Sequence, residues 1–446
     1  MNIDLRASMD SRPMSGFQWI AISICIFLNL IDGFDVLVMA FTASAVSGFW
    51  QLSGAQLGYL LGAGLLGMSI GSLFVAPWAD KLGRRPLVLL CLAVSGIGML
   101  LSAVSATPAQ LGITRVITGI GIGGILACSN VIASEYASSR WRSLALSLQS
   151  TGYAVGALFG GLFAIFLIEN YGWRSVFLLG GTATLAMIPV VYCLLPESMD
   201  FLITKQPGNA LTKINRLAAK LDLPPLDQLP IKSEAYGKQR SPVARLVSRE
   251  YLQKTVWLWL AFFLVLFGFY FVMSWTPKLL ASAGQTAQQG ITGGMLLSAG
   301  GIIGSALLGL LSARFKTTHV HAVFLLITAV TMVFFVKTSG LPGYGVAIAL
   351  LLGVTVNGCV AGLYAIAPTV YDPGVRTTGV GFAIGVGRTG GILSPVVAGF
   401  LIDESWQPAS LFTAYAIGFT VAALVMLKMS YAKRSAPDKM ETAAGQ

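Results

Sequence analysis

The sequence predicts an all-α membrane protein with twelve transmembrane helices in two pseudo-symmetric six-helix bundles. Of the 446 residues, 55% are hydrophobic and 11% are charged, whereas soluble domains carry about 25% charged residues. Apolar runs long enough to cross a bilayer recur along the whole chain. A pattern of glycine and tyrosine in the first half returns in the second half. Together, these three observations exclude a soluble globular protein.

The apolar runs place the twelve helices in order along the chain. Each run has roughly the 18 residues or more that a transmembrane helix needs. The predicted ranges are 17–45, 56–78, 86–105, 109–135, 142–168, 174–195, 252–281, 287–313, 320–337, 343–370, 376–402 and 407–431.

Lysine and arginine gather in alternate connections, and this distribution predicts the orientation. Cytoplasmic loops of membrane proteins are enriched in these residues, so we expect both termini in the cytoplasm. The same distribution accounts for the net charge of +11 without nucleic-acid binding. The basic connections carry Lys81, Arg84 and Arg85, Arg140 and Arg142, Arg314 and Lys316, and Arg376, whereas the others carry little beyond Arg174, Lys278 and Lys337.

One sizeable polar stretch separates the two halves. Within it, apolar residues at helical spacing predict a helix over 209–221 that ends before Pro224 and Pro225. This helix is interpreted as a cytosolic linker, with a regulatory element as the alternative. The predicted parts are a cytoplasmic N-terminus (1–16), a first bundle (17–195), a central cytoplasmic loop (196–251), a second bundle (252–431) and a cytoplasmic tail (432–446).

The two halves repeat one another. The glycines around Gly123 and the following Tyr136 have counterparts about 235 residues later, at Gly358 and Tyr371. Two six-helix halves related by an axis along the membrane normal are a transporter architecture, with the substrate site expected near the midplane between the halves.

The segment Ala76–Arg85 reads APWADKLGRR and resembles the signature GxLADRxGRR of the major facilitator superfamily. Arg115-x-x-x-Gly119-x-Gly121 is similar to the motif of helix four in that superfamily, and Pro196-Glu197-Ser198 closes helix six as in many members. The resemblance implies the major facilitator fold and transport by alternating access.

Within this superfamily, Asp32-Gly33-Phe34-Asp35 resembles the pattern DG[YF]D in helix one of the aromatic acid:proton symporters. Residues 371–381, 385–388 and 197–202 are also similar to that family. The resemblance implies proton-coupled import of a benzoate or hydroxybenzoate by a single chain in the bilayer, with the proton gradient as energy source and no cofactor. The alternatives are an importer of another small organic acid, non-aromatic or nicotinate-like, and an aromatic-acid sensor that does not transport.

Two carboxylates in the first apolar run are the strongest functional candidates. An ionisable group at the centre of a membrane costs at least about 2.5–3.5 kcal/mol, so Asp32 and Asp35 are expected to be functional. Their spacing places them on one face of a helix, and burial and mutual repulsion both favour binding of a proton. Arg115 lies ~9 Å from the outer start of its helix, at a depth similar to that of Asp35. It either pairs with these carboxylates and switches during transport, or pins helices together.

Arg388 lies about 18 Å from the cytoplasmic end of its helix, near the midplane. It either binds a substrate carboxylate, satisfies backbone carbonyls, or pairs with another helix. Five further residues are substrate-site candidates, with packing or interhelical hydrogen bonds as the alternative for each. They are Tyr270 and Trp275 in an aromatic-rich helix and Asn130, Asn357 and Tyr364 in helices four and ten, which by resemblance line the cavity.

A conformational role is predicted for charged residues at the cytoplasmic ends. Asp80, Arg84 and Arg85 are expected to bridge neighbouring helices in one of two states. We expect Glu135 and Arg142, at the inner end of helix four and just beyond it, to join this network.

The remaining reactive side chains predict no enzyme or metal site. The five cysteines are odd in number and lack metal-ligand spacing, so they are expected to be buried thiols. Serines and cysteines occur without a nearby histidine base. His319 and His321 are expected to face solvent or lipid headgroups at the cytoplasmic start of helix nine.

Overall fold

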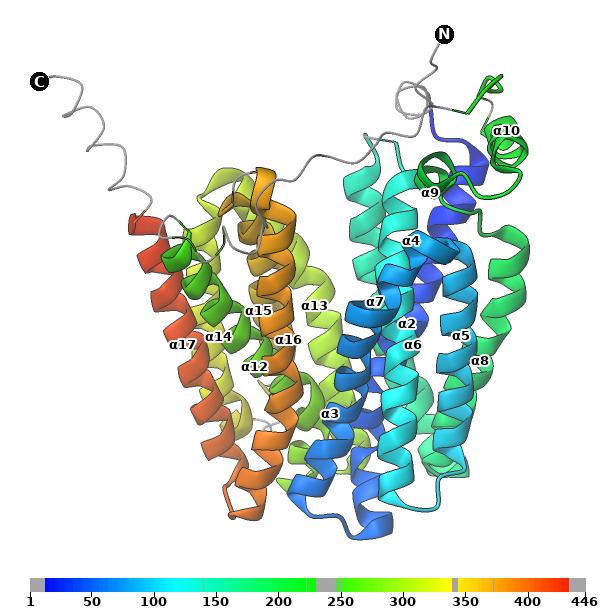
Figure 1. Cartoon of the computed structure of the whole chain (residues 1–446). Coiled ribbons are helices and arrows are strands. Elements are labelled where there is room, and N and C mark those ends of the chain that lie inside the picture. The colour runs from blue at the N-terminus through cyan, green and yellow to red at the C-terminus, as the bar shows by residue number, and fades with distance from the viewer. Residues whose placement is uncertain are drawn as a thin grey trace, which may run out of the picture. The chain divides into compact units, whose positions relative to one another are not determined.

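The computed structural model describes residues 13–138, 140–221, 223–229, 246, 248, 251–338, 344–371 and 373–432 (Figure 1). In this part of the chain, twelve helices are long and apolar enough to cross a membrane. The all-α prediction with twelve spans is therefore confirmed. The N-terminus before residue 13, most of the central loop after residue 229 and the tail after residue 432 lie outside the described residues.

The helices of the first half follow the predicted ranges closely. Thr107 caps one of them by accepting a hydrogen bond from the backbone of Gln110, which satisfies a helix N-terminus. The helices are α2 (Gly16–Trp50), α3 (Gly54–Ile70), α5 (Arg84–Ala103), α6 (Pro108–Tyr136), α7 (Arg142–Tyr171) and α8 (Arg174–Leu194), with a π turn (Gly71–Val75), a 3-10 turn (Ala76–Trp78) and α4 (Ala79–Leu82) between α3 and α5.

The helices of the second half also match the predicted ranges. A capping box of Thr286 and Gln289 begins one of them. The central segment contributes α9 (Met199–Lys205) and α10 (Ala210–Lys220); after it come α12 (Leu252–Ser282), α13 (Ala287–Arg314), α14 (Thr317–Thr338), α15 (Tyr344–Ile366), a 3-10 turn (Ala367–Thr369), α16 (Pro373–Asp403) and α17 (Pro408–Ala432).

The helices form two compact units. Unit 1 comprises Met1–Val38 and Ala63–Gly237, and unit 2 comprises Met39–Gly62 and Lys238–Gln446. The division therefore differs from the predicted bundles at residues 39–62, which belong to unit 2. Both α2 and α3 continue from one unit into the other without a break in the helix.

Unit 1 brings α2 and α7 into backbone contact. A Cβ atom added at Gly33 would overlap the carbonyl oxygen of Tyr153, and one at Gly156 would overlap that of Leu30. Small residues allow membrane helices to approach this closely. These contacts fix the part of α2 that carries the two aspartates.

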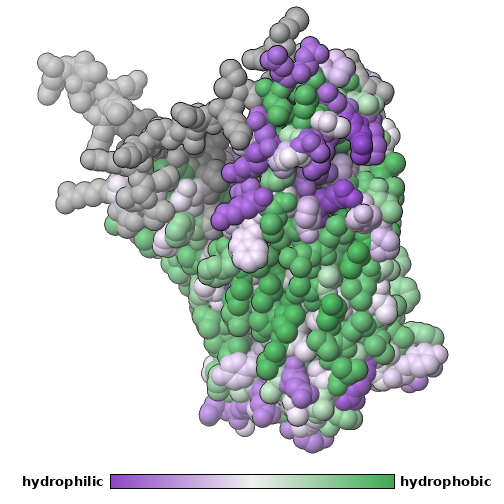
Figure 2. All heavy atoms as spheres, turned by 45° about the vertical axis from the view of Figure 1, so that its right-hand side comes forward, coloured by the Kyte–Doolittle hydropathy of each residue, from purple (hydrophilic) through white to green (hydrophobic). Residues whose placement is uncertain are grey.

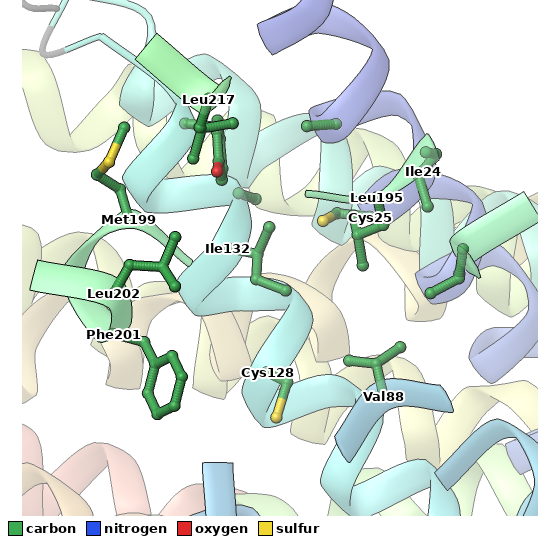
Figure 3. Packing of buried hydrophobic residues seen from close by; sticks show 14 of the residues in the cluster. Ile24, Cys25, Val88, Cys128, Ile132, Leu195, Met199, Phe201, Leu202 and Leu217 are labelled. Atoms are coloured by element: carbon green, nitrogen blue, oxygen red, sulfur yellow. The ribbon is translucent and has the colours of Figure 1, made fainter. Parts of the chain in front are cut away.

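The predicted amphipathic helix of the central segment is present as α10 and packs on unit 1 (Figure 3). Asn215 fixes the chain that follows, since its side chain donates to the Leu226 carbonyl (2.9 Å) and accepts from the Leu226 N–H (2.8 Å). In Figure 1, α9 and α10 lie near α4 at one end of the unit. The buried cluster joins Leu217 of α10 with Met199, Phe201 and Leu202 of α9 and Cys128 and Ile132 of α6.

The surface of the molecule is arranged as a bilayer requires. Figure 2 shows hydrophobic residues over the flank and hydrophilic residues gathered toward the two ends. Large apolar side chains such as Leu90, Ile97 and Leu178 are exposed on this fold, as expected for helices that contact lipid.

Two expectations from the sequence are wrong. His321 is fully buried, and its Nε2 forms a hydrogen bond with the Cys359 carbonyl (2.8 Å). The imidazole fits there because Gly362 has no side chain to occupy the same space. Cys193, expected to be buried, is exposed, whereas the other four cysteines are buried.

The contact between α2 and α7 generates a stability prediction. Gly156→Val should lower the melting temperature of the detergent-solubilised protein, because overpacking costs about 1–3 kcal/mol and this site abuts backbone. Gly16→Val is the control, since a Cβ atom there meets nothing within 4 Å. Equal melting temperatures for the two variants would contradict the assigned packing.

Candidate functional site

The two predicted acids are buried in unit 1. Asp32 and Asp35 of α2 are 1% and 0% exposed, and their carboxylates interact electrostatically. Gly33 between them faces α7, so the glycine and the acids occupy different sides of the helix. The sequence DGFD thus combines close helix packing with two buried carboxyl groups.

The surroundings of Asp35 leave part of its carboxyl group without a hydrogen bond. The Thr184 hydroxyl of α8 lies 3.5 Å from Oδ2, and it also donates to the Gly180 carbonyl at 2.8 Å. A Cβ atom at Gly180 would lie 3.2 Å from Asp35 Oδ1, so this glycine provides room for the acid. Within the described residues, Asp35 Oδ1 and Asp32 Oδ2 are buried without a hydrogen-bond partner.

Arg115 lies beside Asp35 but binds its backbone. Its Nη2 donates to the Asp35 carbonyl oxygen (2.6 Å) and its Nη1 to Met99 Sδ (3.0 Å). The guanidinium carbon is 5.8 Å from the Phe177 ring centroid, a cation–π distance. Among the described residues, no ion pair joins Arg115 to either carboxylate. In this structure Arg115 therefore pins α6 to α2.

This arrangement suits reversible proton binding. A carboxylate buried without a hydrogen-bonded partner has a high desolvation free energy, and a bound proton removes that charge.

A second group of candidates lies in unit 2. Arg388 of α16 is half-buried and lies within electrostatic range of the phenol groups of Tyr270 of α12 and Tyr364 of α15. The Tyr364 ring packs edge-on against Phe262, with centroids 5.8 Å apart. Tyr270 lies over Gly391, where a Cβ atom would be 2.5 Å from its ring. A cation beside two phenols and an aromatic ring can bind an aromatic anion.

The other substrate-site candidates make internal hydrogen bonds. Trp275 is buried, and its Nε1–H donates to the Pro395 carbonyl (3.1 Å). The Asn357 amide donates to Gly353 in its own helix (3.0 Å). The exposed Asn130 likewise donates to the carbonyl four residues earlier in α6 (2.8 Å). The single indole donor of Trp275 is therefore occupied within the protein, and each asparagine amide uses one of its two N–H groups within its own helix.

The predicted conformational network is centred on Arg84 in unit 1. Its guanidinium forms an ion pair with Glu135 and donates to the Ser198 hydroxyl (2.6 Å). That hydroxyl donates to Glu135 Oε2 (2.7 Å). The network therefore joins the N-terminus of α5 to α6 and to the segment that begins α9.

Glu197 caps the same helix end. Its Oε1 accepts hydrogen bonds from the backbone N–H groups of Arg84 (2.9 Å), Arg85 (3.2 Å) and Ser198 (2.8 Å). The chain turns into α5 at Gly83, whose φ of 102° favours glycine. A negative charge at a helix N-terminus is stabilising.

The remaining residues of the predicted network lie apart from this centre. The Arg85 guanidinium binds the Tyr192 carbonyl and lies 5.3 Å from the Tyr192 ring centroid. Arg142 Nε donates to the Ser134 carbonyl (3.0 Å). Asp80 is exposed in α4 and makes no hydrogen bond or ion pair with another described residue.

Three residues around these sites were not identified from the sequence. Glu197 and Ser198 were noted only as a motif that ends a helix. The charged Glu197 next to a hydrogen-bonding Ser198 is a signal for capping. Thr184 carries no sequence signal, because its contact with Asp35 depends on how α8 packs against α2.

Comparisons with known proteins identify the family of this chain. The sequence model of the Major Facilitator Superfamily matches residues 22–350 and 294–445. A gallate transporter of Pseudomonas putida is 33% identical over 442 residues, covering 97% of this chain and 96% of the relative. The 4-hydroxybenzoate transporter PcaK of Acinetobacter baylyi is 29% identical over 434 residues, covering 96% and 94%.

Solved structures show the same fold. The xylose transporter XylE of E. coli, in a partially occluded inward-open conformation, aligns with a TM-score of 0.71 and 14% identity, covering 93% of this chain and 98% of that one. At this identity the likeness concerns the fold alone. The family match and the 33% identical relative show that the chain is a transporter of the Major Facilitator Superfamily, within its family of aromatic acid transporters.

Proposed function

We propose that this protein imports an aromatic carboxylate of the benzoate or hydroxybenzoate class together with a proton. The proposal depends chiefly on the acid pair in α2, which is buried without an ion-pair partner among the described residues. Such a group is stable when it carries a proton and unstable when it is charged, unless a cation or water reaches it. Proton binding and release can therefore control whether the protein changes conformation.

The relatives and the residues around Arg388 in unit 2 support the proposed substrate class. The relatives include transporters named for gallate and 4-hydroxybenzoate, both aromatic acids. In our proposal the Arg388 guanidinium binds the substrate carboxylate, while Tyr270 and Tyr364 contact the ring and its hydroxyl groups. Trp275 is assigned a structural role, since its N–H is bound to Pro395.

The transport cycle we propose is alternating access in a cytoplasmic membrane, with both termini inside and a single chain as the unit. The positive-inside distribution of lysine and arginine supports the orientation. The network of Arg84, Glu135, Ser198 and Glu197 then lies on the cytoplasmic side. We propose that it holds α5, α6 and the start of α9 together as unit 1 moves.

Replacement of the acids tests the coupling. In proteoliposomes, wild-type uptake of labelled 4-hydroxybenzoate should rise with an inward proton gradient. Asp32→Asn and Asp35→Asn should abolish this rise while exchange of internal for external substrate continues, because exchange needs no net proton movement. Asp227→Asn, which removes an exposed charge, is the control. Wild-type uptake that is independent of the gradient would refute proton coupling.

Replacement of the arginine tests the substrate site. Arg388→Gln should weaken binding of 4-hydroxybenzoate at least about tenfold, which corresponds to ~1.4 kcal/mol, because a charge-assisted hydrogen bond is lost. Arg216→Gln, an exposed change on α10, should leave binding unchanged. Isothermal titration calorimetry provides the measurement. Equal affinity of wild type and Arg388→Gln would remove Arg388 from the site.

A further inference from the structure

A row of glycines in α3 packs directly against α16 within unit 2. Gly54, Gly58 and Gly62 are four residues apart and lie along one side of α3. A Cβ atom at Gly54 would overlap the Gly399 carbonyl oxygen, and one at Gly58 would lie 2.5 Å from that of Pro395. At Gly62 the nearest atom, the Ile392 carbonyl oxygen, is 3.1 Å away. The two backbones therefore touch over two turns of helix.

Asp403 closes one end of this contact. At the C-terminus of α16, its Oδ1 accepts the Gly54 N–H (2.6 Å) and its Oδ2 accepts the Ala55 N–H (2.8 Å). Both oxygens thus bind the free N–H groups at the start of α3. Hydrogen bonds to an ionised carboxylate are about twice as strong as neutral ones, and the helix dipole favours the negative charge here.

This contact holds the end of a helix that continues into the other unit. Residues 39–62 belong to unit 2, and α3 enters unit 1 at Ala63. The seam combines close backbone approaches at Gly54 and Gly58 with an aromatic contact between Tyr59 and Phe400, whose ring centroids are 6.0 Å apart. Asp403 adds two hydrogen bonds to the start of α3, and separation of the two helices requires that both are released.

We propose that Asp403 is a latch that holds the N-terminal part of α3 on α16 in one state of the transport cycle and releases it in another. The inference rests on the alternating access proposed above. On the proposed orientation this end of α3 faces outward. Release lets residues 39–62 move with the rest of α2 and α3, and it opens a path to the outside. The glycines permit the close contact, and the carboxylate sets how long the contact lasts.

Distance measurement by double electron–electron resonance tests the latch without any substrate. Spin labels at Gln56→Cys and Gln407→Cys, both exposed positions, report the separation of α3 from the loop after α16 in a Cys193→Ser background. Adding Asp403→Asn should reduce the ratio of short to long distances about tenfold. The asparagine side chain has one acceptor oxygen, so one of the two hydrogen bonds to α3 is lost, and its NH₂ group then faces a backbone N–H of α3. Glu404→Gln, the same change at the next exposed residue, should leave the ratio unchanged.

A second pair of variants tests the seam independently. Gly58→Ala should also shift the distribution to long distances, whereas Gly309→Ala, where a Cβ atom meets nothing within 4 Å, should not. If Asp403→Asn and Glu404→Gln give the same distribution, the latch is refuted. Failure of aromatic acid uptake with an intact distance shift would instead refute the proposed function and leave the latch in place.

Discussion

The requirement that an acid pair remain stable in an apolar helix governs how unit 1 is built. Asp32 and Asp35 are buried, and a charge in that position is expensive unless it is compensated. The protein does not compensate it with a direct ion pair among the described residues. The helices around the acids pack closely: Gly33 contacts α7, and Gly180 leaves room beside the Asp35 carboxyl group. A fixed salt bridge would stabilise the charged form in every state, which would prevent the acids from responding to a proton.

The hydrogen bonds of Arg115 determine how its charge acts on the neighbouring acid. A guanidinium bound to a carboxylate would oppose protonation. Bound to the Asp35 carbonyl at 2.6 Å and to Met99 Sδ at 3.0 Å, it acts on the acid electrostatically while its position is set by the backbone.

The sequence predicted the helices well and the contacts between them only in part. The twelve spans follow from hydropathy, which depends on local composition alone. The acid pair was found because charges are rare in apolar runs. Arg84 was found through the resemblance of residues 76–85 to the superfamily signature, and Glu135 through its position at the inner end of helix four. His321 was misplaced, because its burial depends on the space above Gly362, a residue of another helix. Asp403 was not singled out, because an acid at a helix end is ordinary, and its partner Gly54 lies 349 residues away in the sequence.

The position of the acids within α2 connects the two proposals. Asp35 lies three residues before Val38, where α2 leaves unit 1, and Gly64 of α3 faces Arg115 just after α3 enters that unit. The proposed proton site thus lies close in sequence to the point where α2 leaves unit 1, and Arg115 beside it faces the start of the unit 1 part of α3. In the proposed cycle, a change of charge at Asp35 acts close to the point where α2 leaves unit 1. Asp403 holds the start of α3 in unit 2. Helices transmit such a change over short distances because their backbone hydrogen bonds make them stiff. In our proposal, proton binding and release of the latch are therefore coupled through α2 and α3.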